Sequence, residues 1–198
     1  MDETLRQRAA AVRLLVLDVD GVLTDAGLYY GADGEVMKLF SARDGFAIKA
    51  AQASGIVVGV LTGRLSPPLA ARLRDLAIPR RAVIEGSHDK GGDIERLATR
   101  FEVPLDQCAH IGDDLADLPA LARVGLAACP ADAVPEVRCR CSLVTVAPGG
   151  HGAVREVIET LLTARGAWQR DLAAWAGGGP PAGFWPDDAP RLENGEPE

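Results

Sequence analysis

The chain of 198 residues contains few aromatic residues, three histidines and four cysteines, and it has no excess of positive charge. Its formal net charge is -7, which argues against a nucleic-acid-binding protein because such proteins need a basic face. No apolar run approaches the roughly 20 residues that span a membrane, and residues 1–13 mix both charges without the apolar core of a signal peptide. We therefore expect a cytoplasmic protein whose partners include neither nucleic acid nor membrane.

The cysteines do not form the pattern of a metal site. Cys139 and Cys141 lack the Cys-x-x-Cys spacing of zinc ligands, and Cys108 and Cys129 stand apart from them. In a cytoplasmic chain we interpret all four as small core residues or free thiols.

The hydrophobic residues, 47% of the chain, form short runs that alternate with helical patterns. This length and composition suffice for one domain with a proper core. The apolar runs predict strands at 14–17, 56–61, 83–84, 109–111, 124–128 and 143–146. Periodic positions predict helices at 2–12, from Asp44, from Ser66, at 89–101, at 114–123 and at 152–164, with Asp44 and Ser66 as N-caps. The alternation predicts a doubly wound, Rossmann-like α/β fold with a parallel sheet.

Two segments fall outside this alternation. Two β-favouring runs flank Gly31-Ala32-Asp33-Gly34, which predicts a β-hairpin insertion at about residues 27–41. Residues 177–198 are rich in glycine, proline and acidic residues, so we expect a largely disordered tail after a folded domain of residues 1–176. Aromatic residues that could dock locally near this boundary are Trp168, Trp175, Phe184 and Trp185.

Polar residues follow several of the expected strands, at the edge where open α/β sheets bind ligands. Asp18 and Asp20 follow the first strand, and Thr62 follows the second. Lys90 opens a helical pattern, and a carboxylate cluster, Asp113, Asp114 and Asp117, follows the strand at 109–111. The Asp-x-Asp-Gly sequence alone fits an ordinary turn with solvated carboxylates equally well. The ordered set of carboxylate pair, hydroxyl, lysine and carboxylate cluster is far more specific.

This order of residues resembles the small, capless members of the haloacid dehalogenase-like phosphatases. More narrowly, the chain resembles the 3-deoxy-D-manno-octulosonate 8-phosphate phosphatases, over about residues 13–165. The segments that carry this resemblance are 18–25, Tyr29-Tyr30, Gly34-Glu35, Lys38-Leu39-Phe40, Arg43-Asp44-Gly45, 112–119 and 149–156. The space between Thr24 and Thr62 holds the hairpin and one helix, which leaves no room for a cap domain.

The resemblance implies a role for each polar residue. Asp18 would be the nucleophile that forms an aspartyl phosphate, and Asp20 the general acid and then the general base. Thr62 and Lys90 would bind the phosphoryl group. Asp18, Asp113 and the carbonyl of Asp20 would bind Mg²⁺, with Asp114 and Asp117 orienting the metal-bound waters. For Asp114 and Asp117 the alternative is a favourable position at a helix N-terminus.

The resemblance also implies a set of residues that contact the substrate: Asp20, Ser41, Ala42, Arg43, Asp44, Gly45, Lys49, Arg64, Arg72 and Lys90. Three of them depart from the family pattern, since Asn and Val are more usual at Ser41 and Ala42, and Arg at Lys49. Arg64 and Arg72 fit exposed helix-face charges almost as well. His151, in a glycine-rich segment, fits a loop or capping position better than a catalytic one.

The implied activity is Mg²⁺-dependent hydrolysis of 3-deoxy-D-manno-octulosonate 8-phosphate in lipopolysaccharide inner-core synthesis. Two alternatives remain: a phosphatase for another sugar acid phosphate, such as a nonulosonate 9-phosphate, and a catalytically silent tetrameric regulatory module. The resemblance further implies a homotetramer that packs through the hairpin, with Tyr29, Tyr30, Val36, Met37, Leu39 and Phe40 as exposed interface residues.

Overall fold

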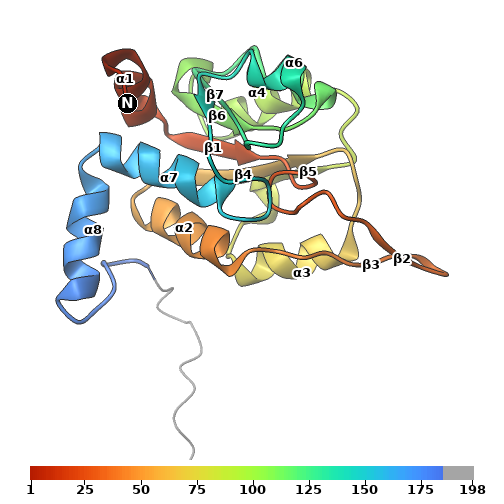
Figure 1. The fold of residues 1–198 in the computed structure, drawn as a ribbon, viewed down its shortest axis with the longest axis horizontal. Helices are drawn as coiled ribbons and strands as arrows, with labels where there is room; N and C mark the ends of the chain where they lie inside the picture. Colours follow the sequence, from red (N-terminus) through yellow and green to blue (C-terminus); the bar gives the residue numbers. More distant parts are fainter. Residues whose placement is uncertain (185–198) are drawn as a thin grey trace, which may run out of the picture.

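Strands and helices alternate along residues 1–184, the part of the chain that the computed structural model describes (Figure 1). The strands are β1 (Leu14–Leu17), β2 (Tyr29–Gly31), β3 (Gly34–Met37), β4 (Val57–Thr62), β5 (Val83–Glu85), β6 (Cys108–Ile111), β7 (Leu126–Cys129) and β8 (Leu143–Val144). The helices are α1 (Glu3–Ala11), α2 (Ala42–Ala53), α3 (Pro67–Asp75), α4 (Lys90–Arg100), α5 (Leu118–Leu121), α6 (Pro135–Arg138), α7 (Ala153–Ala164) and α8 (Ala167–Ala176). A 3₁₀ turn, η3 (Leu115–Asp117), precedes α5. None of the described helices is long and apolar enough to cross a membrane.

Apart from the hairpin, the described strands form one parallel sheet in the order β5-β4-β1-β6-β7-β8. Strands β4 and β5 lie on one side of β1, whereas β6, β7 and β8 lie on its other side. The strand order therefore reverses between β1 and β6. This arrangement confirms the predicted doubly wound sheet. Ligands of such sheets bind outside the carboxyl ends of the strands at this reversal.

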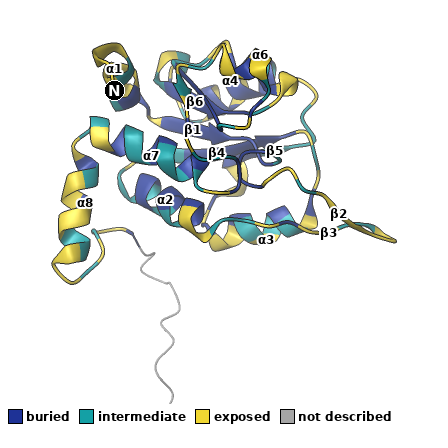
Figure 2. Ribbon diagram, viewed as in Figure 1, coloured by how far each residue is buried: buried dark blue, intermediate teal, exposed yellow. Residues whose placement is uncertain are grey.

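The sheet is buried on both faces (Figure 2). Along β1, Leu15 and Leu17 belong to the core that α2 and α7 complete, whereas Leu14 and Val16 belong to the core beneath α4. All four side chains are fully buried, and burial of each contributes about 2 kcal/mol of hydrophobic free energy. Because β1 is packed from both sides, its carboxyl end is a rigid platform for the residues that follow.

Two helix starts were predicted from capping residues, and one of the two predictions is wrong. The hydroxyl of Ser66 accepts a hydrogen bond from Leu69 N–H, which confirms it as the N-cap of α3. In α2, however, the N-cap is Ser41, whose hydroxyl accepts from Asp44 N–H. The helix therefore begins three residues earlier than expected, and the carboxylate of Asp44 binds the start of α7 instead.

The C-terminal segment packs against the domain through aromatic side chains. Residues 167–176 form α8, and the segment after it returns Phe184 to the core, where Phe184 is 2% exposed. Its ring centroid lies 4.8 Å from that of Phe46 and 5.1 Å from that of Trp175. Trp175 and Phe184 thus dock locally, as expected from their aromatic side chains, and the disorder of the tail stays a prediction. Trp185 and the rest of the tail, 186–198, lie outside the described residues.

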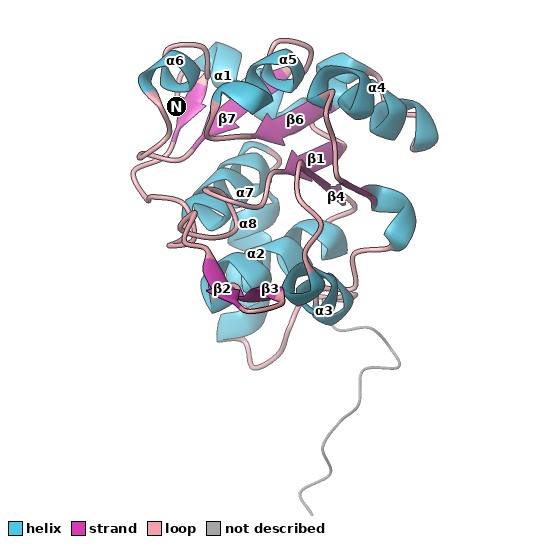
Figure 3. Ribbon diagram, turned by 90° about the vertical axis from the view of Figure 1, so that its right-hand side faces the viewer, coloured by secondary structure: helices cyan, strands magenta, loops and turns pink. Residues whose placement is uncertain are grey.

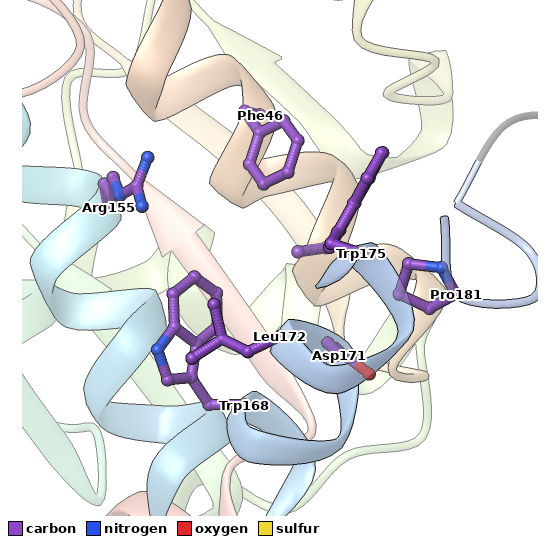
Figure 4. A pocket seen from close by; sticks show the side chains of 8 residues that line it. Phe46, Arg155, Trp168, Asp171, Leu172, Trp175 and Pro181 are labelled. Carbon is purple, nitrogen blue, oxygen red and sulfur yellow. The ribbon is translucent and has the colours of Figure 1, made fainter. Parts of the chain in front are cut away.

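A hollow lies beside this aromatic cluster, between α2, α7 and α8 (Figure 4). The residues that line it are Phe46, Ala50, Arg155, Trp168, Asp171, Leu172, Trp175 and Pro181. Arg155 stacks over the Trp168 ring, 5.8 Å from its centroid, and ion-pairs with Glu159. Both contacts hold the Arg155 guanidinium against the residues that line the hollow.

The predicted hairpin is confirmed as an antiparallel pair, β2 and β3, that projects away from the sheet beside α3 (Figures 1 and 3). Its apolar residues are exposed: Leu28, Tyr29, Tyr30, Val36, Met37 and Leu39. Phe40 differs from the prediction, since it is only half-exposed and packs against the core with Arg72 over its ring.

Candidate active site

Asp18 and Asp20 occupy the loop that leaves β1 at the reversal of the strand order. The backbone N–H of Asp18 still belongs to the sheet, donating to the carbonyl of Ile111 in β6 over 3.0 Å. Gly21 follows with a φ of +86°, and a Cβ at this position would lie 2.0 Å from Oδ2 of Asp113. A glycine is therefore required for the loop of β1 to approach Asp113 closely.

Three carboxylates converge at this point. Asp18, Asp113 and Asp117 each offer an oxygen, and these oxygens lie within 4.8 Å of one another. Burial and the neighbouring charge of Asp117 raise the pKa of Asp18 to about 7, and the same two causes raise the pKa of Asp113 to about 7. The ionised forms lack sufficient counter-charge from the protein, and the donors are all oxygen. Such a cluster fits a hard divalent cation such as Mg²⁺.

Lys90 supplies the positive charge that the protein itself brings to this cluster. It is the first residue of α4, and its Nζ lies 2.9 Å from Oδ2 of Asp18 and 2.8 Å from Oδ1 of Asp117. Burial disfavours the charged ammonium, but Asp18 and Asp117 outweigh it and raise the pKa of Lys90. Lys90 is therefore a fixed cation beside the Asp18 carboxylate.

His110 joins the same network, a contact that the sequence interpretation missed. It is fully buried in β6, with Nδ1 3.1 Å from the carbonyl of Val16 and Nε2 2.8 Å from Oδ1 of Asp117. Both partners are acceptors, so both hydrogen bonds form at once only when both ring nitrogens carry protons. Although burial opposes it, His110 and Lys90 hold the pKa of Asp117 well below its usual range. The only sequence signal was a histidine within an apolar strand.

Asp117 and Asp114 have different positions. Oδ2 of Asp117 accepts from the backbone N–H groups of Asp113 and Asp114, so Asp117 also shapes the loop that carries Asp113. Asp114 is exposed, and its Oδ1 accepts from Leu115 N–H at the start of η3. The alternative interpretation, a carboxylate at a helix start, therefore describes Asp114 well, whereas Asp117 lies within the cluster.

Thr62 and Arg64 approach the site from β4. Thr62 is the last residue of this strand and is buried, and its hydroxyl accepts from Arg64 N–H over 3.3 Å. The Arg64 side chain turns to Asp20, with Nε 3.6 Å from Oδ2, and its guanidinium also donates to the hydroxyl of Tyr30. Arg64 thus faces the site and is not a solvated helix charge.

A second missed residue is Lys38. Its side chain is fully buried, and its ammonium pairs with both Asp20 and Glu35. A lysine directly after a hairpin strand gave no sequence signal of burial.

Comparison with known proteins agrees with this geometry. A family model described as haloacid dehalogenase-like hydrolase matches residues 35–125. The 3-deoxy-D-manno-octulosonate 8-phosphate phosphatase KdsC of Yersinia pestis is 42% identical over 159 residues, which cover 80% of this chain and 84% of that protein. The chain belongs to this phosphatase family, within the haloacid dehalogenase-like hydrolases.

Solved structures of the family share the fold. The Yersinia pestis phosphatase superposes with a TM-score of 0.82 at 39% identity, covering 85% of this chain and 90% of that one. The phosphatase of Moraxella catarrhalis, solved with a magnesium ion, a phosphate ion and a KDO molecule, gives a TM-score of 0.84 at 32% identity. That match covers 88% of this chain and 99% of the other. The expected capless fold of the family is thereby confirmed.

The residues expected to contact substrate fall into two groups in this fold. Ser41, Ala42 and Arg43 lie at the start of α2, where Ala42 and Arg43 are exposed. Asp44 is 1% exposed and faces α7, accepting from the N–H groups of Gly152 and Arg155. In this structure Asp44 therefore holds two helices together and has little surface left for a ligand.

Arg72, Gly45 and Lys49 also have structural partners. Arg72 donates to the carbonyl of Ser41 over 3.1 Å and pairs with Asp75. A Cβ on Gly45 would lie 2.1 Å from the Arg72 guanidinium. Arg72 therefore braces the start of α2. Lys49 lines a separate hollow, two helical turns from Ser41, together with Gln52, Asp75, Leu76, Ala77, Gly183 and Phe184.

Proposed function

We propose that this protein hydrolyses 3-deoxy-D-manno-octulosonate 8-phosphate to the free sugar acid and phosphate, with Mg²⁺, in lipopolysaccharide inner-core synthesis. The observation that carries this proposal is the contact of Lys90 with Asp18 beside Asp113, at the carboxyl edge of the sheet. The names of the relatives and the contents of the Moraxella catarrhalis structure support the substrate and the metal.

Asp18 and Asp113 would hold Mg²⁺ with their carboxylates, and Asp20 with its main-chain carbonyl. The raised pKa of both carboxyls fits this role, because burial and the charge of Asp117 outweigh the counter-charge that Lys90 supplies. When bound, the ion supplies the positive charge that offsets the repulsion between a phosphate and the Asp18 carboxylate. Asp117, and Asp114 at the rim, would orient water ligands around it.

The chain's own residues account for the remaining chemistry. Asp18 attacks the phosphorus atom and forms an aspartyl phosphate. Asp20 gives a proton to the departing sugar oxygen and then takes one from the water that cleaves this intermediate. Lys90 and the hydroxyl of Thr62 bind the phosphoryl oxygens, where the Lys90 charge stabilises the transition state.

The sugar acid requires cations and hydrogen-bond donors around the phosphate site. Arg64 and the exposed start of α2, with Ser41, Ala42 and Arg43, are positioned to supply them. We assign Asp44, Gly45 and Arg72 to the support of this segment, and Lys49 to a more distant position. The proposal includes one domain over residues 1–176, a homotetramer through the hairpin, and a cytoplasmic location.

The deciding experiment measures phosphate release, with and without Mg²⁺, from the octulosonate 8-phosphate, a nonulosonate 9-phosphate and simple sugar phosphates. We expect Mg²⁺-dependent turnover with a strong preference for the octulosonate. A preference for the nonulosonate, or equal rates on all substrates, would retain the chemistry and reject the substrate. No turnover on any of them would favour the silent regulatory module and contradict the proposal.

A further inference from the structure

The hairpin contributes a buried lysine to the catalytic loop. The Lys38 side chain is fully buried directly after β3, and its ammonium pairs with Oδ1 of Asp20. The same Nζ lies 2.7 Å from Oε1 of Glu35 in β3, whose side chain is 6% exposed. Asp20 is therefore connected to the hairpin through a cation that is itself held by a second carboxylate.

The two oxygens of Asp20 have unequal surroundings. Oδ1 is bound by Lys38, whereas no hydrogen bond from the described residues reaches Oδ2, which lies 3.6 Å from Arg64 Nε. Arg64 is in turn held by Tyr30 of β2, through a hydrogen bond and a ring contact. One oxygen is thus anchored from the hairpin, and the other is buried beside Arg64 with no hydrogen bond from the described residues.

Stability alone does not explain a buried lysine between two carboxylates. Taking such charges out of water costs free energy that their attraction offsets only in part, so apolar residues of similar size would stabilise the fold equally well. A general acid, in contrast, must lie within hydrogen-bond distance of the atom it protonates, and an error of about 1 Å can cost on the order of 10²-fold in rate. Asp20 lies in a loop beyond β1 and needs an external partner to fix its side chain.

We propose that Lys38, clamped by Glu35, is a positioning residue that orients the Asp20 carboxylate for proton transfer to the departing sugar oxygen. This inference rests on the proposed phosphatase function. It gives the hairpin a role in its own subunit's site, because β3 carries the clamp and Lys38 follows it directly.

The test compares substrates whose leaving groups differ in their need for a proton. A sugar alkoxide is a poor leaving group and requires protonation, whereas the phenolate of 4-nitrophenyl phosphate departs without it. For Lys38→Met we expect kcat/KM on octulosonate 8-phosphate to fall on the order of 10²-fold or more. On 4-nitrophenyl phosphate we expect kcat/KM to fall less than about tenfold, because its leaving group departs without a proton. Lys38→Arg keeps the cation and should recover most of the sugar phosphate activity.

A double variant separates positioning from folding. Lys38→Met leaves two carboxylates without their cation, which lowers stability, whereas the pair Glu35→Gln with Lys38→Met removes one of those charges. We expect the double variant to regain melting temperature but to keep the selective loss on the sugar phosphate. Arg165→Met serves as the matched control, because Arg165 donates to the carbonyl of Ala10, far from the site. This variant should change kcat/KM on the two substrates by the same factor.

Each outcome has a distinct meaning. An equal loss on both substrates for Lys38→Met, or sugar phosphate activity that returns with stability in the double variant, would overturn the positioning role. The proposed function would then still stand, because the wild-type chain would be active. A wild-type chain inactive on both substrates would contradict the proposed function, and the role of Lys38 with it.

Discussion

Asp44 in the first turn of α2 accepts a 2.8 Å hydrogen bond from the backbone N–H of Arg155 in the first turn of α7. A second bond, from Gly152 N–H over 3.1 Å, binds its other oxygen. The N-terminal N–H groups of a helix have no partner within the helix, and a carboxylate is their best acceptor. One buried side chain thus joins the glycine-rich segment before α7 to the helix that follows the hairpin.

We expect Asp44→Ala to lower the free energy of unfolding by about 1–3 kcal/mol, because two buried N–H groups lose their acceptor. Urea denaturation measures this change, with Arg43→Ala as the control at an exposed neighbouring position. Unchanged stability together with a strongly raised KM would instead make Asp44 a substrate-binding residue.

Asp18→Asn should lower phosphate release at least about 10³-fold, because an amide cannot form the aspartyl phosphate. The substitution should leave the metal-free fold intact at pH 8, since the amide keeps the shape of the side chain and relieves the burial of a charge. Phosphate release and circular dichroism measure the two effects, with Asp106→Asn as a control at an exposed position outside the site. Turnover close to wild type in Asp18→Asn would reject Asp18 as the nucleophile.

The sheet and the meeting of Asp18 with Asp113 were predictable because each depends on short local patterns and on the geometry of a parallel sheet. Short apolar runs predicted the strands, and carboxylates directly after β1 and β6 had to meet at one edge of a parallel sheet. Lys90 was predictable only through the ordered set of motifs, because its side chain reaches Asp18 from a helix that begins far along the chain. Its contact with Asp117 followed from no pattern.

The contacts that the sequence did not reveal depend on where whole elements pack. The sequence around Asp44 is compatible both with an N-cap of α2 and with a hydrogen-bonded contact to α7. Only the packing of α7 decides between these two positions. Lys38 and His110 are polar residues within or beside β-strands, and their burial depends on carboxylates that are distant in sequence. Phe184 and Trp175 were expected to dock locally from their aromatic side chains, but only the packing of α8 and the segment after it identifies Phe46 of α2 as their partner.

Stabilisation by Mg²⁺ should increase with pH. In the metal-free fold the pKa values of Asp18 and Asp113 are about 7, above the ordinary 3.8, so the folded chain retains protons that the unfolded chain releases. Their favourable contribution is therefore complete below about pH 4 and is lost as the pH rises through about 7. Mg²⁺ replaces these protons, so its effect should be small at pH 5.5 and large at pH 8.

Thermal melts with and without Mg²⁺ between pH 5.5 and 8 measure this dependence. The Mg²⁺-induced rise in Tm should be several degrees larger at pH 8 than at pH 5.5. Asp113→Asn should abolish most of this difference, whereas Asp106→Asn, at an exposed position outside the site, should preserve it. A rise in Tm that does not depend on pH would contradict the competition between protons and metal.

The last prediction concerns the exposed hairpin. Val36 is 61% and Leu39 53% exposed, and together with the neighbouring Tyr30 they form more apolar surface than a two-stranded hairpin keeps in water without a partner. We therefore expect Val36→Asp and Leu39→Asp to convert a tetramer into smaller species, as measured by light scattering. Phe40 is a poor choice for this test because its ring packs against the core, so a charge there would also destabilise the fold. Val146→Asp is the matched control, since Val146 is 88% exposed but lies outside the hairpin. Tetramers that persist in both hairpin variants, or that dissociate equally in Val146→Asp, would place the subunit interface elsewhere.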